Sequence, residues 1–186
     1  MKYSTLMARW RLRCGLAQTR DGCSLDYTAG IDIDALLHSR IADWYMRLVS
    51  QGHTEALIPA DISDAIMINT AFDRSQIELQ LPERCLCPVS VSIENMPCTI
   101  IDRQKHPRMA ALVLAPTPGV AGATDGPEAV YDPAVNTITI PFCRSISGDK
   151  ISCMALVAPP ATPSPDYDFP VRENALALLP DVINLY

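Results

Sequence analysis

Glycine, aromatic residues and long apolar runs are all scarce in this chain of 186 residues. It contains eight glycines, and phenylalanine, tryptophan and tyrosine together make up 6% of it. Such a chain has little of the backbone freedom that phosphate-binding loops need, and neither a P-loop nor a G-x-G-x-x-G motif occurs. The scattered aromatic residues offer no platform on which the bases of a single strand could stack. No run of about 18 apolar residues is present, so we expect no membrane-spanning helix.

The net charge of −6 is unevenly distributed along the chain. Residues 1–20 hold five basic residues and no acidic one, and Arg9, Arg11 and Arg13 are among them, while the other 166 residues hold ten basic and 21 acidic ones. An acidic body repels nucleic acid, so any phosphate contact is expected from the N-terminal segment alone, where Trp10 accompanies the arginines. The alternatives are a solvated helix face, pairing with the acidic body, or a contact between subunits.

The beginning of the sequence does not read as a secretory signal, because arginines interrupt any apolar core there. The chain has seven cysteines, an odd number. Without an export signal, the cysteines are expected to be reduced and to act as small apolar side chains. These features favour the cytoplasm of a bacterial host.

Apolar residues at helical spacing predict helices in the first third of the chain. A first helix is expected over residues 4–18. A more regular pattern starts at Ala35, and Gly52 is a natural residue to end that helix. Residues 62–71 show a less regular pattern that favours a third, shorter helix.

From residue 77 the pattern changes to the alternation typical of strands. Strands are predicted over seven short segments: 77–81, 89–93, 98–101, 111–115, 129–131, 137–142 and 151–157. Residues 116–123 are expected to form an exposed loop, and residues 147–150 a hairpin turn. Six or seven short strands separated by turn residues favour an antiparallel β-sandwich or a barrel-like sheet.

The C-terminal part begins with a proline-rich stretch, residues 158–165, that predicts an extended strap. A C-terminal helix is expected after it, over residues 171–186. Its apolar residues would be buried on the chain's own domain or on a neighbouring subunit. They are therefore candidate subunit contacts: Leu176, Leu179, Val182 and Ile183.

Together these elements predict an α+β protein with N-terminal helices, an antiparallel β body and a C-terminal helix. The expected parts are a basic arm over residues 1–30, a helix with a β domain over 31–157, and a strap with a helix over 158–186. The length suits one domain with extensions rather than two full cores.

Residues suited to catalysis or metal binding form no recognisable motif. Cys85, Cys87, Cys98 and His106 could offer zinc ligands, but their spacing is not that of a zinc finger or ribbon. A Cys/His hydrolase needs a nucleophile, a base and an orienting group that converge in space. The candidate bases are three histidines: His38, His53 and His106. We therefore predict a non-enzymatic chain without catalytic, cofactor-binding or metal-binding residues.

The order of several segments along the chain resembles the order found in a known class of proteins. A helix from Ile33 to Val49 is followed by Ala56-Leu57-Ile58-Pro59, then by a strand ending in Leu-Pro-Glu at residues 81–83, and then by Pro-Val-Ser-Val-Ser-Ile at residues 88–93. Over about residues 31–157 this resembles small virion structural proteins of gut-bacterial phages and prophages, of the connector, neck or ring type. Where such proteins carry a tryptophan and a basic residue after the Val-Ser strand, this chain has Glu-Asn-Met-Pro-Cys at residues 94–98.

The resemblance implies a non-enzymatic assembly protein that forms a homo-oligomeric ring. Its partners would be further copies of itself and other virion proteins, and it would be located in the virion. The residues alone also leave three other functions open: a binding module for an unknown protein or small ligand, a Cys/His hydrolase, and a regulator that contacts nucleic acid.

Overall fold

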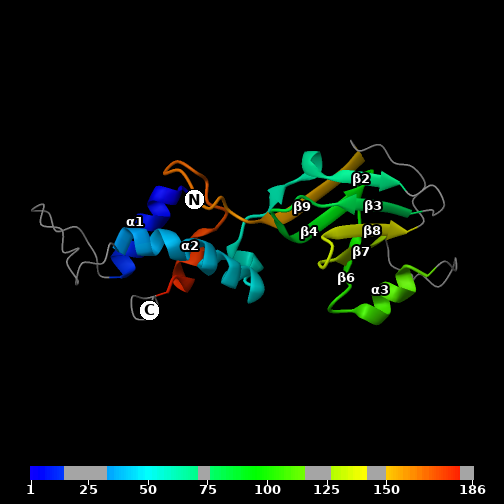
Figure 1. Cartoon of the computed structure of the whole chain (residues 1–186), viewed down its shortest axis with the longest axis horizontal. Coiled ribbons are helices and arrows are strands. Elements are labelled where there is room, and N and C mark those ends of the chain that lie inside the picture. Colours follow the sequence, from blue (N-terminus) through cyan, green and yellow to red (C-terminus); the bar gives the residue numbers. More distant parts are fainter. Residues whose placement is uncertain (15–32, 71–75, 116–126, 142–149, 181–186) are drawn as a thin grey trace, which may run out of the picture. The chain divides into compact units, whose positions relative to one another are not determined.

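The structure, a computed structural model, describes five stretches of the chain: residues 1–14, 33–70, 76–115, 127–141 and 150–180. The chain divides into two compact units (Figure 1). The first, here the helical unit, comprises Met1–Ile58 and Ala158–Tyr186, and the second, here the strand unit, comprises Pro59–Val157. The helix expected to share a domain with the strands thus belongs to the helical unit together with both ends of the chain.

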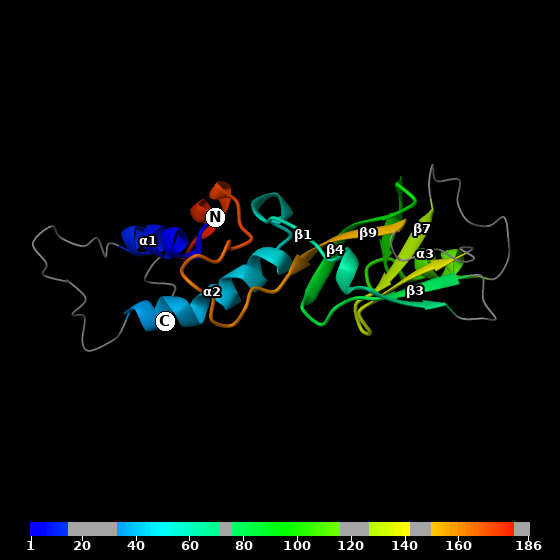
Figure 2. The ribbon, with the colours of Figure 1, turned by 90° about the horizontal axis from the view of Figure 1, so that it is seen from above.

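In the part of the helical unit that the structure describes there are two α-helices and two 3₁₀-helices: α1 (Tyr3–Arg13), α2 (Ile33–Ser50), η1 (Thr54–Ala56) and η4 (Glu173–Leu178). α1 and α2 lie side by side (Figure 2). α1 buries four residues spaced as one helical face: Tyr3, Leu6, Met7 and Trp10. The buried residues of α2 follow the predicted spacing: Leu37, Ile41, Trp44, Tyr45 and Leu48. Two amphipathic helices thus form one core, and α1 extends to Arg13, while residues 15–18 of the predicted helix lie outside the described residues.

Gly52 ends α2 as the sequence predicts. Its φ of 77° lies in the left-handed region that glycine adopts at little cost. The Gly52 N–H donates to the Val49 carbonyl at 3.1 Å, and the His53 N–H donates to the Leu48 carbonyl at 3.0 Å. This is the Schellman arrangement, which satisfies carbonyls that the end of a helix leaves open.

The C-terminal segment differs from the predicted helix over residues 171–186. Val171 forms an antiparallel β-bridge with Leu57, and the only helical part among the described residues is the 3₁₀-helix η4. Side chains of α1 and α2 donate to its carbonyls: Arg13 to that of Leu176 at 3.1 Å, and the indole of Trp44 to that of Leu178 at 3.0 Å. Residues 181–186, and with them part of the predicted helix, lie outside the described residues.

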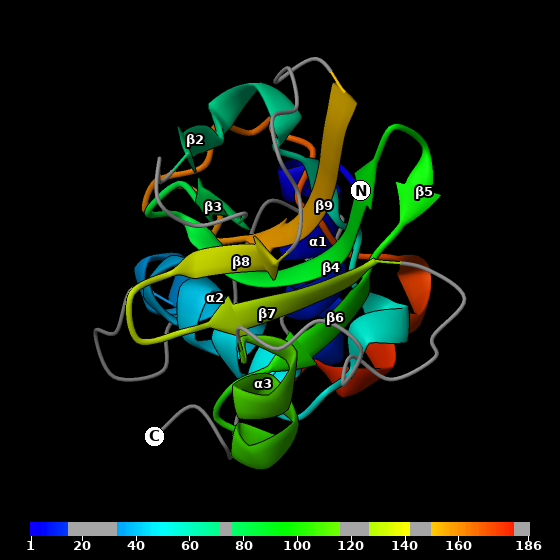
Figure 3. The same cartoon turned by 90° about the vertical axis from the view of Figure 1, so that its right-hand side faces the viewer.

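The described residues of the strand unit form nine strands: β1 (Ala60–Asp61), β2 (Met67–Thr70), β3 (Gln76–Gln80), β4 (Cys85–Ile93), β5 (Met96–Pro97), β6 (Thr99–Asp102), β7 (Glu128–Asp132), β8 (Thr137–Pro141) and β9 (Ile151–Val157). They form a four-stranded sheet in the order β1-β9-β4-β5 and a five-stranded sheet in the order β2-β3-β8-β7-β6 (Figure 3). Among the described strands, β6 and β7 run parallel, and the other pairs are antiparallel. The predicted α+β class is therefore confirmed. The prediction that all strands run antiparallel is wrong, because β6 and β7 are parallel.

One hydrophobic cluster contains residues from both sheets. Ile77, Leu79 and Ile138 come from the five-stranded sheet, and Val91 and Ile151 come from the four-stranded one. The alternation of apolar and polar residues along β3 therefore has the predicted meaning, because Ile77 and Leu79 are fully buried. The sheets share this core but remain two open sheets with edges at β1, β5, β2 and β6.

The helix predicted over residues 62–71 is wrong. Asp61 accepts hydrogen bonds from the backbone N–H and the hydroxyl of Ser63, which support a single 3₁₀ turn, η2 (Ser63–Ala65). The chain then enters β2, which pairs with β3 from Met67 opposite Gln80 to Thr70 opposite Ile77. Pairing with a later strand thus overrides the weak local helical pattern.

The strand predicted at residues 111–115 is also wrong, because α3 (Pro107–Val113) occupies most of this stretch. Pro107 stands in the first turn, where its missing N–H costs nothing. Ala110 and Val113 pack on Ile101 of β6 and Val130 of β7. A helix here is typical of the crossover between parallel strands, and it lies in the connection between β6 and β7.

The described strands on either side of the hairpin predicted at residues 147–150, β8 and β9, belong to different sheets. Residues 147–149 of the turn, and the loop predicted over residues 116–123, lie outside the described residues.

Candidate functional site

The two groups of residues predicted as contact sites meet each other in the helical unit. A guanidinium nitrogen of Arg9 lies 3.4 Å from the Glu173 carboxylate, and the guanidinium of Arg13 donates to the Leu176 carbonyl at 3.1 Å. Trp10 is fully buried, and its indole N–H donates to the Pro180 carbonyl at 3.0 Å. The basic N-terminal helix therefore holds the C-terminal segment of its own chain.

The first residues of the chain add a short pairing with the strap. The Phe169 N–H donates to the Met1 carbonyl at 2.8 Å, and the Tyr3 N–H donates to the Tyr167 carbonyl at 2.9 Å. The Lys2 ammonium lies 3.0 Å from the Asp168 carboxylate. We call residues 1–13 together with residues 163–180 the terminal clasp.

The clasp settles where the described part of the C-terminal segment packs. Leu179 is buried and Leu176 is half-buried, so the segment docks on its own chain, one of the two arrangements expected. Val182 and Ile183 lie outside the described residues. Arg9 and Arg13 are both engaged by the clasp. No observation here tests whether the arginines also bind nucleic acid, so that role stays a prediction.

An aromatic cluster lies at the centre of the clasp. The ring of Phe169 stacks on Tyr3 with a centroid distance of 5.8 Å, and meets Tyr45 and Tyr167 edge-on at 5.7 and 6.2 Å. Burial, and then the neighbouring Tyr167, raise the pKa of Tyr45 to about 12. The Tyr45 hydroxyl is buried without a hydrogen-bond partner in the described structure. These features suit a packed core rather than a site where protons are exchanged.

A pocket of about 290 Å³ borders this cluster. Its walls come from α1, α2 and the strap: Tyr3, Ser4, Met7, Ala8, Arg11, His38, Pro163 and Pro165. The Tyr3 hydroxyl is hydrogen-bonded to Nδ1 of His38, and burial raises the pKa of Tyr3. The pocket thus combines apolar walls with a phenol–imidazole pair and one guanidinium.

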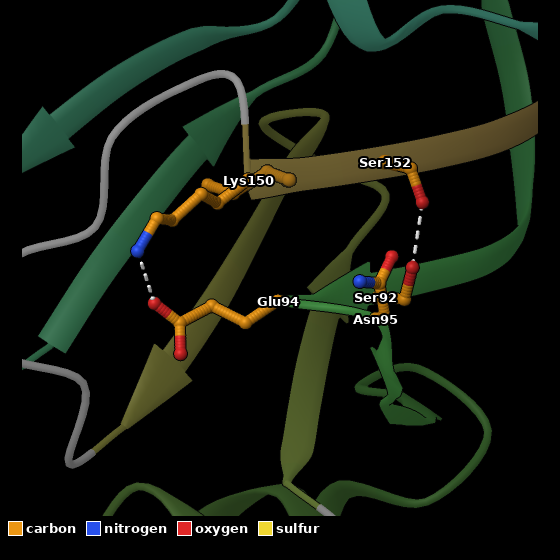
Figure 4. Close-up of a pocket in the computed structure, with 6 residues that line it drawn as sticks. Ser92, Glu94, Asn95, Lys150 and Ser152 are labelled. Carbon is orange, nitrogen blue, oxygen red and sulfur yellow. Dashed lines mark hydrogen bonds and ion pairs between the residues drawn. The ribbon is translucent and has the colours of Figure 1, made fainter.

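A second pocket, of about 300 Å³, lies in the strand unit (Figure 4). It lies where β4 ends beside the beginning of β9, with Ile93 paired to Ile151. Lys150 and Glu94 point toward each other and form an ion pair at 2.7 Å (Figure 4). The hydroxyls of Ser92 and Ser152 lie 2.6 Å apart across the two strands. Because the carboxylate holds the ammonium, this pocket can offer hydroxyl and charged groups to a small polar molecule but has no activated nucleophile.

The turn beside this pocket carries backbone strain. Glu94 and Asn95 both have positive φ, 49° and 69°, and connect β4 to β5. This is the conformation of a tight hairpin turn, which prefers asparagine and glycine.

The thiols are poor nucleophiles where they are buried. Burial raises the pKa of Cys85 to about 11 and that of Cys153 to about 12, and it also raises the pKa of the half-buried Cys87. The thiolate is the reactive form, so the two buried thiols are inert near neutral pH. Cys98 packs against the same hydrophobic cluster as Cys85.

The candidate bases lie on separate elements. His38 is on α2 beside Tyr3, His53 lies 3.5 Å from Glu55 just after α2, and the exposed His106 precedes α3 in the strand unit. In the described stretches no three His, Cys, Asp or Glu side chains gather as a metal would require. The described structure also contains no helix that is both long and apolar enough to cross a bilayer.

Comparison of this chain with protein-family models, with curated protein sequences and with solved structures finds no match. Function is therefore inferred from the geometry of the chain alone.

Several features of the surface had no counterpart in the sequence predictions. Ten large apolar side chains are exposed in the described structure: Leu12, Met46, Ile58, Met67, Val89, Met96, Met109, Leu112, Val135 and Leu178. Four of them are methionines, out of seven in the chain. Methionine is an adaptable side chain that is enriched at binding surfaces. Only burial identifies these positions, because the sequence pattern does not distinguish them from core residues.

Proposed function

We propose that this chain is a non-enzymatic structural or assembly protein that forms a homo-oligomer, as a connector-, neck- or ring-type subunit of a phage or prophage virion does. The observation that carries the proposal is the exposure of large apolar side chains on the strand unit. Met67 is 64% exposed, Met96 52% and Met109 55%. Contact with further copies of the chain, or with other virion proteins, would remove such side chains from water.

The terminal clasp supports the proposal. An assembly subunit needs a rigid body. Backbone pairing and an ion pair join residues 1–3 to the strap, and the buried ring of Phe169 packs on Tyr45 of α2. The strand unit suits the same role, since two sheets around one core form a sandwich-like body with edges available to neighbours.

The distribution of reactive groups supports a role without catalysis. The buried thiols Cys85 and Cys153 are protonated at neutral pH, and the histidines lie on separate elements rather than around one pocket. We place the protein in the cytoplasm of a bacterial host during assembly, and afterwards in the virion.

Sedimentation velocity of the full chain tests the proposal. We expect a species of several subunits whose population grows with concentration, and a monomer at all concentrations would contradict the proposal. The genes beside the one encoding this chain test the virion role, since portal, capsid or tail genes would support it and metabolic genes would count against it.

A second candidate is a binding module for a small ligand, favoured by the pocket between α1, α2 and the strap. Its volume of about 290 Å³ and the Tyr3–His38 pair suit a small, partly apolar molecule. Nuclear magnetic resonance of the His38 imidazole during a screen of small aromatic carboxylates tests it. A concentration-dependent shift of His38 that His53 and His106 do not share would support a ligand, and an unchanged His38 signal throughout would exclude ligands of this class.

A further inference from the structure

We propose that copies of this chain associate head to tail through opposite edges of the five-stranded sheet. The surface of α3, with Arg108, Met109 and Leu112, would dock on the β2 edge of the next copy, with Asp64 and Met67. The inference rests on the proposed function and names the surfaces that would build the oligomer.

The first surface is basic and apolar. Met109 and Leu112 are 55% and 52% exposed, and Arg108 lies on the same side of α3, four residues before Leu112. Ala110 and Val113 anchor the other side of the helix in the core. The exposed pair is therefore held on a fixed element and is not needed to hold that element in place.

Charge distinguishes Arg108 from its basic neighbours. Arg103 is paired with Asp132 at 2.7 Å, and Lys105 is paired with Asp102 at 3.3 Å. Arg108 is exposed and forms no ion pair within the described part of the chain. Its charge is therefore available to a neighbouring acidic surface.

The second surface is acidic and apolar. Asp64 is exposed and makes no ion pair with any described residue, and Met67 is 64% exposed. Asp61 adds a second carboxylate, whose pKa is lowered by hydrogen bonds from Ser63, so it is charged at neutral pH. A surface with carboxylates and an exposed methionine complements one with a guanidinium and exposed apolar side chains.

The strand beside these carboxylates is poorly protected as an edge. β2 has the sequence Met-Ile-Asn-Thr, and among the described strands it pairs with β3 alone. Natural sheets usually protect such edges with charged residues, prolines or bulges, and β2 has none of these within its four residues. By contrast, the edge strand β5 has two residues, one of them Pro97. The β2 edge therefore has no charged residue or proline that would oppose the approach of another copy.

The two surfaces cannot meet within one copy. The sheet order places β2 at one edge and β6 at the other, and α3 packs against β6 and β7 (Figure 3). Contact between them must join different copies, and each copy then keeps one free surface of each kind. Such a head-to-tail contact repeats until a ring closes or a filament grows. A two-fold pairing of β2 with β2 would instead leave the α3 surface, with Arg108 and Met109, unused.

Charge reversal at Asp64 and Arg108 tests the pairing. We expect Arg108→Glu and Asp64→Arg each to raise the apparent dissociation constant about tenfold or more in sedimentation equilibrium, because each places like charges together. The double variant exchanges the charges at every contact and should restore association close to that of the unchanged chain. Met109→Gln should weaken association without a change of charge. Arg47→Glu, on the exposed side of α2, is the matched control and should leave association unchanged.

The outcomes separate this inference from the proposed function. An oligomer that neither reversal weakens, or that the double variant does not restore, would overturn the head-to-tail contact and leave the assembly role standing. A chain that stays monomeric at every concentration would overturn both. Circular dichroism of each variant shows whether the fold is kept, and Met109→Gln provides an independent result where a charge variant does not fold.

Discussion

Phe169 is the residue on which the terminal clasp most depends, and its replacement by alanine tests the structure of the helical unit. The ring is fully buried and contacts Tyr3, Tyr45 and Tyr167. Truncation would leave a cavity between the strap and the two helices. It would also remove three aromatic contacts at once.

The expected loss is large compared with the stability of a small domain. Replacement of a buried phenylalanine by alanine typically costs about 3–5 kcal/mol, because the transfer free energy of the ring and the cost of the cavity add. With a dependence on urea of about 2 kcal/mol per molar, the midpoint of unfolding would fall by about 2 M. Leu178→Ala is a suitable control, since Leu178 lies on the same segment but is 39% exposed, and it should cost less than about 1 kcal/mol.

Tryptophan fluorescence during urea unfolding measures this effect in the helical unit specifically. The chain has two tryptophans, Trp10 and Trp44, and both lie in that unit. If Phe169→Ala unfolds the unit outright, the emission will already be shifted to the red without urea, which agrees with the expected loss. A Phe169→Ala midpoint no lower than that of Leu178→Ala would refute the packing described for the clasp.

Three further predictions concern the strand unit. Asn95→Ala should lower its free energy of unfolding by about 1 kcal/mol, because alanine disfavours the φ of 69°, whereas Asn95→Gly should be at least as stable as the unchanged chain; thermal unfolding followed by circular dichroism of both variants decides this. Iodoacetamide at pH 8 should label Cys85 and Cys153 only after unfolding, since burial raises the pKa of both thiols, and rapid labelling of either in the folded chain, located by peptide mass spectrometry, would contradict the structure. The pKa of Asp102 is lowered: burial opposes the shift, but hydrogen bonds from the backbone N–H groups of Lys105 and Gln104 and the Lys105 ammonium outweigh it. A carboxyl with a lowered pKa stabilises the fold above its unfolded pKa of about 3.9, and this contribution is lost as the pH falls through the lower folded value. Acid titrations should therefore show a smaller loss of stability below about pH 4 in Asp102→Asn than in the unchanged chain.

Elements with a regular local pattern are those that the sequence predicts well. α2 has apolar residues at helical spacing and ends at Gly52, and both features have the expected structural meaning. The strand over residues 77–81 was predicted from the alternation of apolar and polar residues. The observed β3 spans Gln76–Gln80, and its two apolar side chains, Ile77 and Leu79, are buried. In these elements local propensity and burial favour the same structure, so each can be recognised without its partner.

Elements that depend on distant partners were missed. α3 lies on a short apolar run without a clear period, and only Pro107 indicates a helix start. β2 is a strand because it pairs with β3, which a local helical pattern over residues 62–71 obscures. Short apolar runs do not distinguish a helix from a strand unless their tertiary neighbours are known.

The candidate contact residues show the same limit. Trp10 and Leu179 were both recognised as apolar residues on extensions, yet nothing in the sequence indicates that these two extensions pack together in one unit. The indole of Trp10 donates to the carbonyl of Pro180, 170 residues further along the chain. The pairing of Tyr3 with His38 likewise joins two helices that the sequence separates by a long connection.

The mass of the intact chain in solution tests the assembly role most directly. Native mass spectrometry over a range of protein concentrations should find species at several multiples of the 20.3 kDa subunit, with more than two subunits in the largest. A single species at 20.3 kDa at every concentration would contradict the role proposed for this protein.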